Sequence, residues 1–542
     1  MKTFKLFSMA ALALTMAACS NEDNEILQNT QQPGTMHFTA TIAAPSGDAA
    51  TRTAYTEDGT TINVKWEVGD KIALVHNGVV DEAEVTAVDG SGKATIEATI
   101  TGSPSDNDDV YLAYPANAVV DATPYSPFPF TPNSDIFDNV KNYQDGTLAY
   151  IQNNLDLRMG SGQLAVNGSD VSLKESVSVS SLICIWKLTL QDNAATPNAL
   201  NATQLTFKNN TYTQAKATSA AKSEYYLCVV PSFIPDASGT FSFEATVGSD
   251  TYTFSKTGLS LTAGKYYQST VTMAKLTDLS TISSNYEAQN GETLTGTLGS
   301  NVKISIADGA TVTLKDVTIN GTNDSSYGWA GITCEGNATI TLEGTNTVKG
   351  FADDYPGIFV SSGKTIVING TGELNASSNG SYDNGSGGAG IGGGNKMDCG
   401  NIEIQSGTVI ATGNQYGAGI GGGQNANCGN ITISGGTVTA TGGYRAAGIG
   451  GGRRGTVTSS CGNITISGGT IIATGGEDAA GIGGGRGNGN ATYSSCGTIT
   501  ITSGVTSVTA TKGSSYAQSI GAGRYGDCGA VTIEDGANVT QN

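Results

Sequence analysis

The feature that most restricts the fold of this chain is a five-fold repeat in its last third. Each unit has a glycine-rich block, a short polar loop, and a Cys-Gly block followed by alternating apolar and threonine residues. The glycine-rich blocks begin at Ala389, Ala418, Ala447, Ala480 and, in a degraded form, Gln518. The cysteines of the Cys-Gly blocks are Cys399, Cys428, Cys461, Cys496 and Cys528. Self-similarity at a nearly constant period is typical of architectures made of stacked repeats.

The alternation inside each unit identifies the kind of repeat. In the second unit Ile431 and Ile433 flank Thr432, which is the period of two expected for a strand with one buried face. A Gly-Gly pair then interrupts the run, and glycine can turn a corner without a steric penalty. One coil cannot bury its apolar face alone, so the coils have to stack. We therefore expect a solenoid, a right-handed parallel β-helix, over residues 301–542.

The rest of the chain has a different composition. Eleven of the twelve prolines lie before residue 276, so the architecture is expected to change within residues 276–300, which we predict to be a linker or cap. Residues 36–275 contain short alternating apolar runs separated by turn residues. Such runs predict an all-β module with one or two sandwich-like subdomains.

The N-terminus is typical of a targeting segment. Residues 1–18 place Lys2 and Lys5 before an apolar run, which ends in small residues ahead of Cys19. This pattern resembles the lipobox of bacterial lipoproteins, in which the cysteine receives the lipid and becomes the mature N-terminus. The resemblance implies a signal peptide over residues 1–18 and lipidation of Cys19. An ordinary secretory peptide is the alternative.

An acidic and flexible tether is expected over residues 19–35. Its segment Ser20–Glu25 resembles the surface-export signal of lipoproteins from Bacteroides-type bacteria. The resemblance implies a surface-exposed lipoprotein of the outer membrane, with the membrane as a partner through the N-terminal lipid.

Short motifs within residues 36–275 carry a further resemblance. They are Thr51-Arg52-Thr53, Gly69-Asp70-Lys71-Ile72, Tyr111-Leu112-Ala113-Tyr114-Pro115, Tyr225-Tyr226-Leu227-Cys228-Val229-Val230-Pro231 and Ala263-Gly264-Lys265-Tyr266-Tyr267. In this order they resemble fimbrillin-family proteins of Bacteroidales. The family implies two transthyretin-like β-sandwich subdomains. In its pilus-forming members a protease cuts after an arginine near the N-terminus, and Arg52 stands where such a cut would fall.

The resemblance also bears on assembly. In polymerising members, loss of the first strand opens a groove that a strand of another subunit fills. In this chain a solenoid follows the module, where those members have a free C-terminal donor strand. A pilus tip, an anchor or a stand-alone surface protein therefore fits better than a mid-pilus subunit, and other fimbrial subunits are candidate partners.

The charge and the glycine-rich block exclude two classes of ligand. The formal net charge is −20, whereas nucleic-acid binding needs a basic face. The glycine-rich block lacks the Lys-Ser or Lys-Thr ending and the strand-to-helix context of a phosphate-binding loop. We expect no nucleic acid, no cofactor and no metal.

In-register stacking would bring the five repeat cysteines into one row, which we call the cysteine ladder. Cα atoms one coil apart, about 4.8 Å, fall within the disulfide range. Side chains of a parallel row point the same way, so buried free thiols are expected, and some disulfides are the alternative. A single row also does not make a tetrahedral metal cage.

Catalysis has little support in the repeats. Polysaccharide lyases and hydrolases use β-helices, but they need carboxylates gathered on one coil face. Acidic residues of the coil loops occupy different repeat positions or distant coils: Asp353, Asp354, Asp398, Glu477, Asp478 and Asp527. We expect no enzyme, and a polysaccharide-degrading β-helix is the alternative that these positions disfavour.

Two corners of each coil vary in length and carry the candidate glycan-binding residues. The candidates are Tyr416, Tyr444 and Tyr516 before the Gly-Ile pair, and Arg453, Arg454, Arg486 and Arg524 after the glycine-rich block. If the coils keep register, the guanidinium groups line one edge and suit the carboxylates and sulfates of acidic glycans. The tyrosine rings suit stacking on sugars. Solvated loop side chains are the alternative for both sets.

Two functional hypotheses follow. In the first, the chain is a non-enzymatic cell-surface lipoprotein, either a fimbrial-type adhesin or a glycan-binding protein. In the second, it is a structural tip or anchor of a pilus, and its β-helix is passive.

Overall fold

The computed structural model describes residues 36–45, 56–58, 61–63, 65–234, 236–380, 387–455, 459–489 and 494–542. Cys19 and Arg52 lie outside these residues, so their lipidation and cleavage stay predictions. The chain divides into two compact units, one with residues 1–43, 67–132 and 160–178, and one with residues 44–66, 133–159 and 179–542. In the described part, no helix has the length and apolar character needed to cross a membrane.

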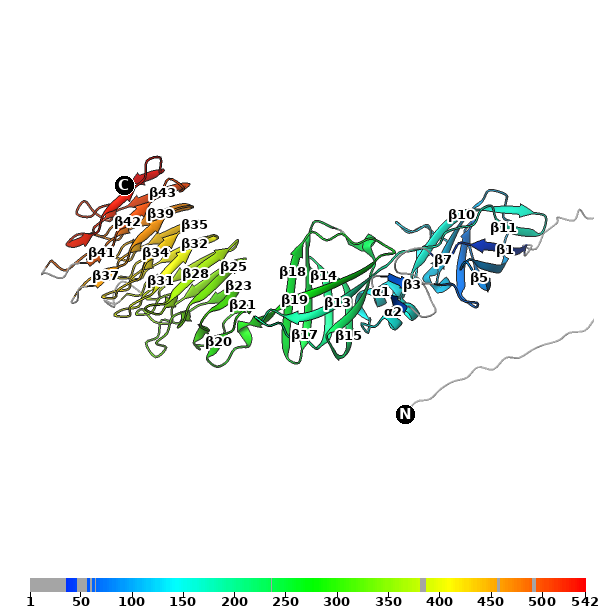
Figure 1. The fold of residues 1–542 in the computed structure, drawn as a ribbon, viewed down its shortest axis with the longest axis horizontal. Helices are drawn as coiled ribbons and strands as arrows, with labels where there is room; N and C mark the ends of the chain where they lie inside the picture. The colour runs from blue at the N-terminus through cyan, green and yellow to red at the C-terminus, as the bar shows by residue number, and fades with distance from the viewer. Residues whose placement is uncertain are drawn as a thin grey trace, which may run out of the picture. The chain divides into compact units, whose positions relative to one another are not determined.

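The first unit is built around one β-sheet (Figure 1). Its strands follow the order β11-β1-β6-β5-β4-β7-β10, and β10 also pairs with β11, so the sheet closes on itself. Strand β1 is held between β6, to which it is antiparallel, and β11, to which it is parallel. The bounds are β1 (Met36–Ile42), β4 (Lys71–His76), β5 (Val79–Val88), β6 (Ala94–Ile100), β7 (Asp109–Tyr114), η1 (Ala116–Ala118), β8 (Val119–Asp121), β9 (Thr131–Pro132), β10 (Arg158–Asn167) and β11 (Asp170–Leu173).

The second unit contains two short helices that the strand pattern did not predict, α1 (Ser134–Asn142) and α2 (Leu148–Asn154). Each begins at a residue whose side-chain oxygen accepts a first-turn N–H, Asn133 for α1 and Thr147 for α2. A two-stranded hairpin, β2 (Thr56–Asp58) and β3 (Thr61–Asn63), precedes them in the chain.

A β-sandwich follows in the same unit. One sheet has the order β16-β13-β19 and the other β15-β14-β17-β18. Its core is aromatic, since the ring of Trp186 meets Phe207 and Phe243 edge-on at centroid distances of 5.7 and 5.2 Å. The bounds are β12 (Ser180–Ser181), β13 (Cys184–Asp192), β14 (Ala202–Asn209), β15 (Tyr212–Lys222), β16 (Glu224–Val229), η2 (Pro231–Phe233), β17 (Thr240–Val247), β18 (Asp250–Thr257) and β19 (Tyr266–Asp278).

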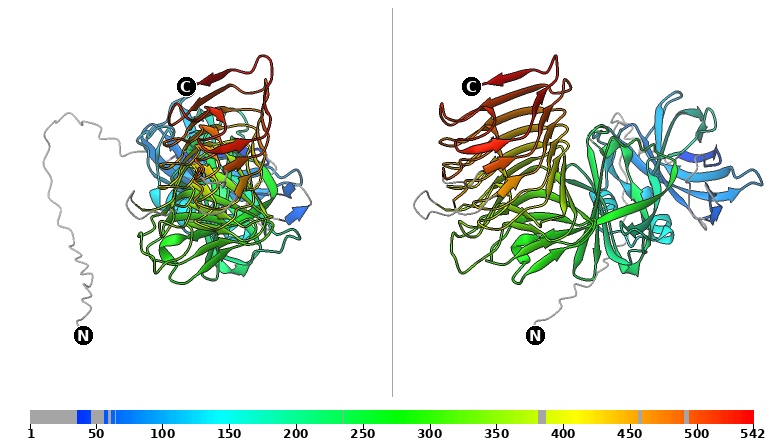
Figure 2. Two further views of the ribbon diagram at one scale, coloured as in Figure 1. Left: turned by 90° about the vertical axis from the view of Figure 1, so that its left-hand side faces the viewer. Right: turned by 60° about the vertical axis from the view of Figure 1, so that its left-hand side comes forward.

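The C-terminal part of the second unit is the β-helix that the repeat predicts (Figures 1 and 2). It begins where β21 pairs with β19 of the sandwich and with β23, both in parallel. The first elements are η3 (Leu279–Thr281), β20 (Tyr286–Ala288), β21 (Thr293–Thr297), β22 (Ile304–Ile306) and β23 (Ala310–Ile319). The segment predicted as a linker or cap thus contains η3, β20 and β21.

Three long rows of parallel strands form the walls of the solenoid. The first row is β25 (Ala338–Glu343), β28 (Thr365–Gly370), β31 (Asn401–Ile404), β34 (Ile431–Ile433), β38 (Ile464–Ile466), β42 (Ile499–Ile501) and β46 (Val531–Ile533). The second row is β26 (Thr345–Lys349), β29 (Glu373–Ser377), β32 (Thr408–Thr412), β35 (Thr437–Thr441), β39 (Thr470–Thr474), β43 (Ser507–Thr511) and β47 (Val539–Gln541). The third row continues from β20 and β22 through β24 (Ile332–Cys334), β27 (Ile358–Val360), β30 (Ile391–Gly392), β33 (Ile420–Gly421), β36 (Ile449–Gly450), β40 (Ile482–Gly483) and β44 (Ile520–Gly521). A short row is β37 (Ser459–Cys461), β41 (Ser494–Cys496) and β45 (Gly526–Cys528).

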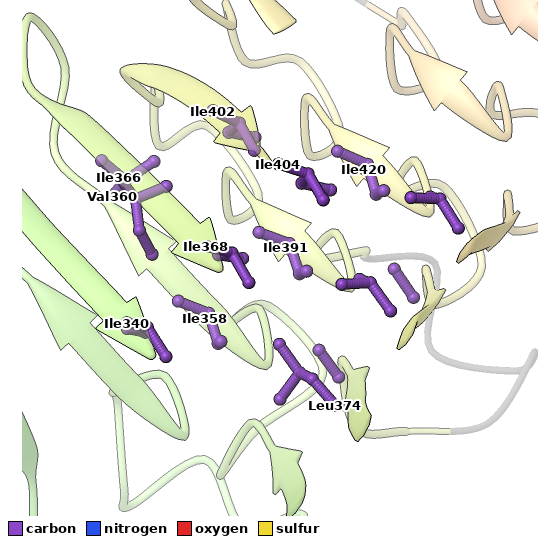
Figure 3. Packing of buried hydrophobic residues seen from close by; sticks show 14 of the residues in the cluster. Ile340, Ile358, Val360, Ile366, Ile368, Leu374, Ile391, Ile402, Ile404 and Ile420 are labelled. Atoms are coloured by element: carbon purple, nitrogen blue, oxygen red, sulfur yellow. The ribbon is translucent and has the colours of Figure 1, made fainter. Parts of the chain in front are cut away.

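The register between coils aligns identical residues of successive coils with one another. Ile433 pairs with Ile404 on one side and Ile466 on the other, and all three side chains are fully buried. Figure 3 shows the same arrangement in earlier coils, where isoleucines of successive strands line up in the core. The predicted inward rows of isoleucine are therefore confirmed.

Candidate functional site

The two variable corners of the coil meet along one edge of the solenoid. The backbone N–H of Arg453 donates to the carbonyl of Tyr416 at 2.9 Å, although these residues lie in successive coils. The same contact recurs one and two coils later, from Arg486 to Arg445 at 2.9 Å and from Arg524 to Asp478 at 2.8 Å. We call this surface the tyrosine–arginine edge. It comprises Tyr416, Tyr444, Arg445, Arg453, Glu477, Asp478, Arg486, Tyr516, Arg524 and Tyr525.

Guanidinium groups lie over the tyrosine rings of this edge. The central guanidinium carbon is 4.3 Å from the ring centroid in both the Arg453–Tyr416 and the Arg524–Tyr516 pairs. Such cation–π contacts stabilise the pair by about 0.5–1 kcal/mol at exposed sites and fix the plane of the guanidinium. The tyrosines therefore orient the arginines, and one ring face of Tyr416 and Tyr516 is closed to the sugar stacking that the sequence suggested.

Asp478 is the internal counter-ion of the edge. Its carboxylate lies 3.1 Å from Nη1 of Arg524 and 3.5 Å from Nε of Arg486, and it accepts a hydrogen bond from the Ser514 hydroxyl. Burial would raise the pKa of Asp478, but the hydrogen bonds from Ser514 and Arg524 and the charges of both arginines hold it below its usual range. One ionised carboxylate is thus shared by two guanidinium groups.

Arg453 has no carboxylate of its own. Among the described residues, no carboxylate oxygen lies within 4.0 Å of its guanidinium nitrogens, whereas Arg445 has Glu477 at 3.5 Å. Burial lowers the pKa of Arg453, and the charges of Arg445 and Arg486 lower it further, while Tyr416 offsets part of the shift. An arginine remains protonated under all ordinary conditions, so this cluster carries an excess of positive charge.

The structure brings together six of the seven predicted glycan-binding residues and excludes the seventh. The side chain of Arg454 is 0% exposed, so it does not lie on the edge beside Arg453 as the sequence suggested. Arg445, Tyr525, Glu477 and Asp478 were not predicted to belong to the site. The first two stand next to Tyr444 and Arg524 in the sequence, and this adjacency of Tyr and Arg was the signal that could have identified them.

Acidic residues of the coil loops have structural roles in different places. Asp354 accepts a hydrogen bond from the Asn395 side chain at 3.0 Å, and Asp398 accepts two from Asn427. Asp527 binds the N–H of Cys528 at 2.8 Å. Among the described residues, no group of three or more His, Cys, Asp or Glu side chains has the geometry to hold a metal ion.

Comparison with known proteins identifies the repeat. A β-helix repeat family matches residues 402–424, 431–453 and 464–486, which confirms the β-helix in three successive coils. No curated protein matches the chain.

Among solved structures, the chain is similar to a fimbrial protein from Bacteroides ovatus, with 15% identity over 44% of this chain and a TM-score of 0.25. The match spans 49%, about half, of the length of that protein. A fimbrial assembly protein from Parabacteroides distasonis has 13% identity over 44% of this chain and 92% of its own, with a TM-score of 0.25.

Proposed function

We propose that this chain is a non-enzymatic cell-surface lipoprotein of the fimbrial type, and that its tyrosine–arginine edge binds acidic glycans. The observation that carries the proposal is the oriented guanidinium of Arg453, which has no carboxylate partner within the described part of a protein of net charge −20. Among the described residues, two carboxylates, Glu477 and Asp478, pair with the arginines of this edge, which number four, and this excess of positive charge favours an anionic partner. Guanidinium forks match carboxylate and sulfate groups with paired hydrogen bonds.

The spacing of the edge suits a chain-like ligand. The backbone positions of Arg453, Arg486 and Arg524 recur once per coil, so these positions are separated by about one coil rise, roughly 4.8 Å. An acidic polysaccharide carries a carboxylate or sulfate on every sugar or every second sugar, and several of its charges could engage the edge at once. Uronic-acid polymers and sulfated glycosaminoglycans are the two ligand classes with this chemistry.

Arg453→Ser is expected to weaken the binding of a sulfated glycosaminoglycan fragment to the full chain roughly tenfold or more. A charge-assisted hydrogen bond contributes about 1.5–3 kcal/mol, which corresponds to this range of affinity. Titration calorimetry at two salt concentrations measures the effect. Lys364→Ser removes a positive charge from another part of the solenoid, where Asp308 pairs with it at 3.6 Å, and is the matched control.

A second variant should change the affinity in the opposite direction. Asp478→Asn removes the carboxylate that Arg486 and Arg524 share, so two more guanidinium groups become available and binding should strengthen severalfold. Absence of salt-sensitive binding by the unmutated protein would reject the proposed function. So would equal affinities of the Arg453→Ser and Lys364→Ser variants.

The lipid anchor is tested at Cys19. Cys19→Ser is expected to abolish lipidation and to release the protein from the outer-membrane fraction, because the thiol is the only attachment point in the lipobox-like sequence. Metabolic labelling with a fatty acid and membrane fractionation measure both effects. A mutant that still carries the label and still sediments with the membrane would rule out the lipoprotein assignment.

One observation favours the structural role in a pilus as a second function. Strand β1 precedes Arg52 in the chain and is paired on both sides, through Phe38 with Ala98 of β6 and with Val171 of β11. Cleavage after Arg52 would separate β1 from the rest of the chain and leave two strand edges for a strand of another subunit. A binding edge on the solenoid is compatible with this role at a pilus tip.

A further inference from the structure

The cysteine ladder forms a continuous row of thiols along the solenoid. Cys461 pairs in parallel register with Cys428 on one side and with Cys496 on the other, and Cys496 pairs with Cys528. At the start of the row, Sγ of Cys399 lies 2.8 Å from Sγ of Cys428. All five are free thiols, and all but Cys528 are buried. Each inner cysteine therefore has a thiol on both sides.

The side chain of Arg454 is buried next to this row. It is 0% exposed, and among the described residues its Nε, Nη1 and Nη2 atoms have no hydrogen-bond partner. Its backbone N–H donates to the carbonyl of Arg486 at 3.0 Å, which fixes the loop that carries it. A guanidinium does not lose its proton in a protein, and an unpaired buried charge is strongly destabilising. The interior next to Arg454 therefore requires an anion.

Thiols of the cysteine ladder are the buried acidic groups that interact electrostatically with Arg454. Burial lowers the pKa of Arg454 to about 10, and the group that opposes this shift most strongly is Cys461. Asp398 also opposes it, but this carboxylate is exposed and already accepts two hydrogen bonds from Asn427. The other groups that oppose the shift, Cys428 and Cys399, belong to the cysteine ladder, and Cys461 has the strongest effect of the three thiols.

The neighbours of Cys461 stabilise its ionised form. Hydrogen bonds from Cys428 and Cys496, with the charge of Arg454, outweigh burial and lower the pKa of Cys461 to about 5. The pKa values of the two neighbours shift in the opposite direction. Hydrogen bonds to Cys399 and Cys461, with burial, raise the pKa of Cys428. The hydrogen bond to Cys461 and burial raise the pKa of Cys496, although its bond with Cys528 lowers it. A thiolate at Cys461 would therefore lie between a protonated thiol on each side, Cys428 and Cys496. A low-pKa thiolate beside a resolving thiol is the arrangement found in oxidant-sensitive proteins.

We propose that Cys461 is a peroxide-reactive thiolate and that Cys428 or Cys496 resolves its oxidised form to a disulfide. The thiolate sulfur attacks one oxygen of hydrogen peroxide, the O–O bond breaks, and hydroxide leaves a sulfenic acid on Cys461. The sulfur of the neighbouring thiol then attacks the sulfenic sulfur, the S–O bond breaks, and the S–S bond forms with release of water. Two cysteines are oxidised by two electrons, and one peroxide is reduced to water and hydroxide. This proposal does not depend on glycan binding.

Hydrogen peroxide is the probe for the test, because it is little larger than water and can enter where larger thiol reagents cannot. The purified full chain is exposed to peroxide, quenched in acid, denatured, alkylated and mapped by mass spectrometry. We expect Cys461 joined to Cys428 or Cys496 before Cys184 or Cys334 is oxidised. These two buried thiols are internal controls, since burial raises the pKa of each to about 12.

Variants at Arg454 test whether its positive charge, and not only the proximity of the thiols, promotes the oxidation of Cys461. Arg454→Gln should slow oxidation of Cys461 roughly tenfold or more, because loss of the cation raises the pKa of the thiol, whereas Arg454→Lys should retain most of the rate. If the glutamine variant does not fold, Cys461→Ser supplies the test, since it should abolish the rapid peroxide consumption that Cys334→Ser leaves intact. Oxidation of Cys461 no faster than that of Cys184, or an unchanged rate in a folded Arg454→Gln variant, would overturn the proposal.

Discussion

Ile466→Asp is expected to lower the free energy of unfolding by about 4 kcal/mol or more, because it places an unpaired carboxylate in the solenoid core. The side chain of Ile466 is fully buried between Ile433 and Ile501 of the neighbouring coils. Each coil contacts only its two neighbours, so one disrupted coil separates the coils on either side. Thermal unfolding followed by circular dichroism, and limited proteolysis, measure the loss.

The adjacent Thr465→Asp is the matched control for this change. Thr465 stands one residue away on the same strand, but it is partly exposed and lies between Thr432 and Thr500 on the outer face. The same carboxylate there remains in contact with water, and its effect should stay within about 0.5 kcal/mol. Similar losses for both variants would show that the assignment of inward and outward positions is wrong.

Gly450→Ala is expected to destabilise the solenoid by about 3 kcal/mol or more, since backbone strain and a steric clash add at this position. Gly450 ends β36 with φ +130°, a conformation that residues with a Cβ rarely adopt. A Cβ built there would lie 2.0 Å from the carbonyl oxygen of Gly483 in the next coil. Gly421 and Gly483 have the same conformation and the same close contact, so the backbone has no room to move.

Gly299→Ala is the control for the glycine prediction. A Cβ on Gly299 meets no atom within 4 Å, and its φ lies outside the left-handed region. This variant should be neutral or slightly stabilising, because alanine reduces the entropy of the unfolded chain. The two midpoints of thermal unfolding are compared at the same protein concentration. A Gly450→Ala midpoint equal to that of Gly299→Ala would contradict the close stacking of β36 on β40.

The N-terminal half was predicted less completely than the solenoid. Its strands follow from alternating apolar runs, but α1 and α2 were missed. Ile136 and Val140, four residues apart and both buried in α1, form the apolar face of a helix too short to stand out against the surrounding strand pattern. Closure of the first sheet through β10 and β11 also could not be predicted, because the pairing of distant strands depends on tertiary contacts.

The coil, its register and its core follow from the amino-acid sequence alone. A period of two with a glycine corner permits only one way of burying Ile431 and Ile433, and a shift by one residue would turn every isoleucine to solvent. The repeat therefore predicted the stacking, the inward rows and the alignment of the cysteines. These properties follow from the backbone period, which is local.

The environment of the charged side chains, in contrast, depends on tertiary contacts. Arg453 and Arg454 are neighbours in the sequence, yet one lies over the ring of Tyr416 and the other is fully buried. Two long arginine side chains that start from adjacent positions can end in different environments. Loops from other coils determine whether such a side chain reaches the surface or the interior. Asp478 shows the same dependence, because Ser514 and Arg524 of the next coil donate hydrogen bonds to its carboxylate.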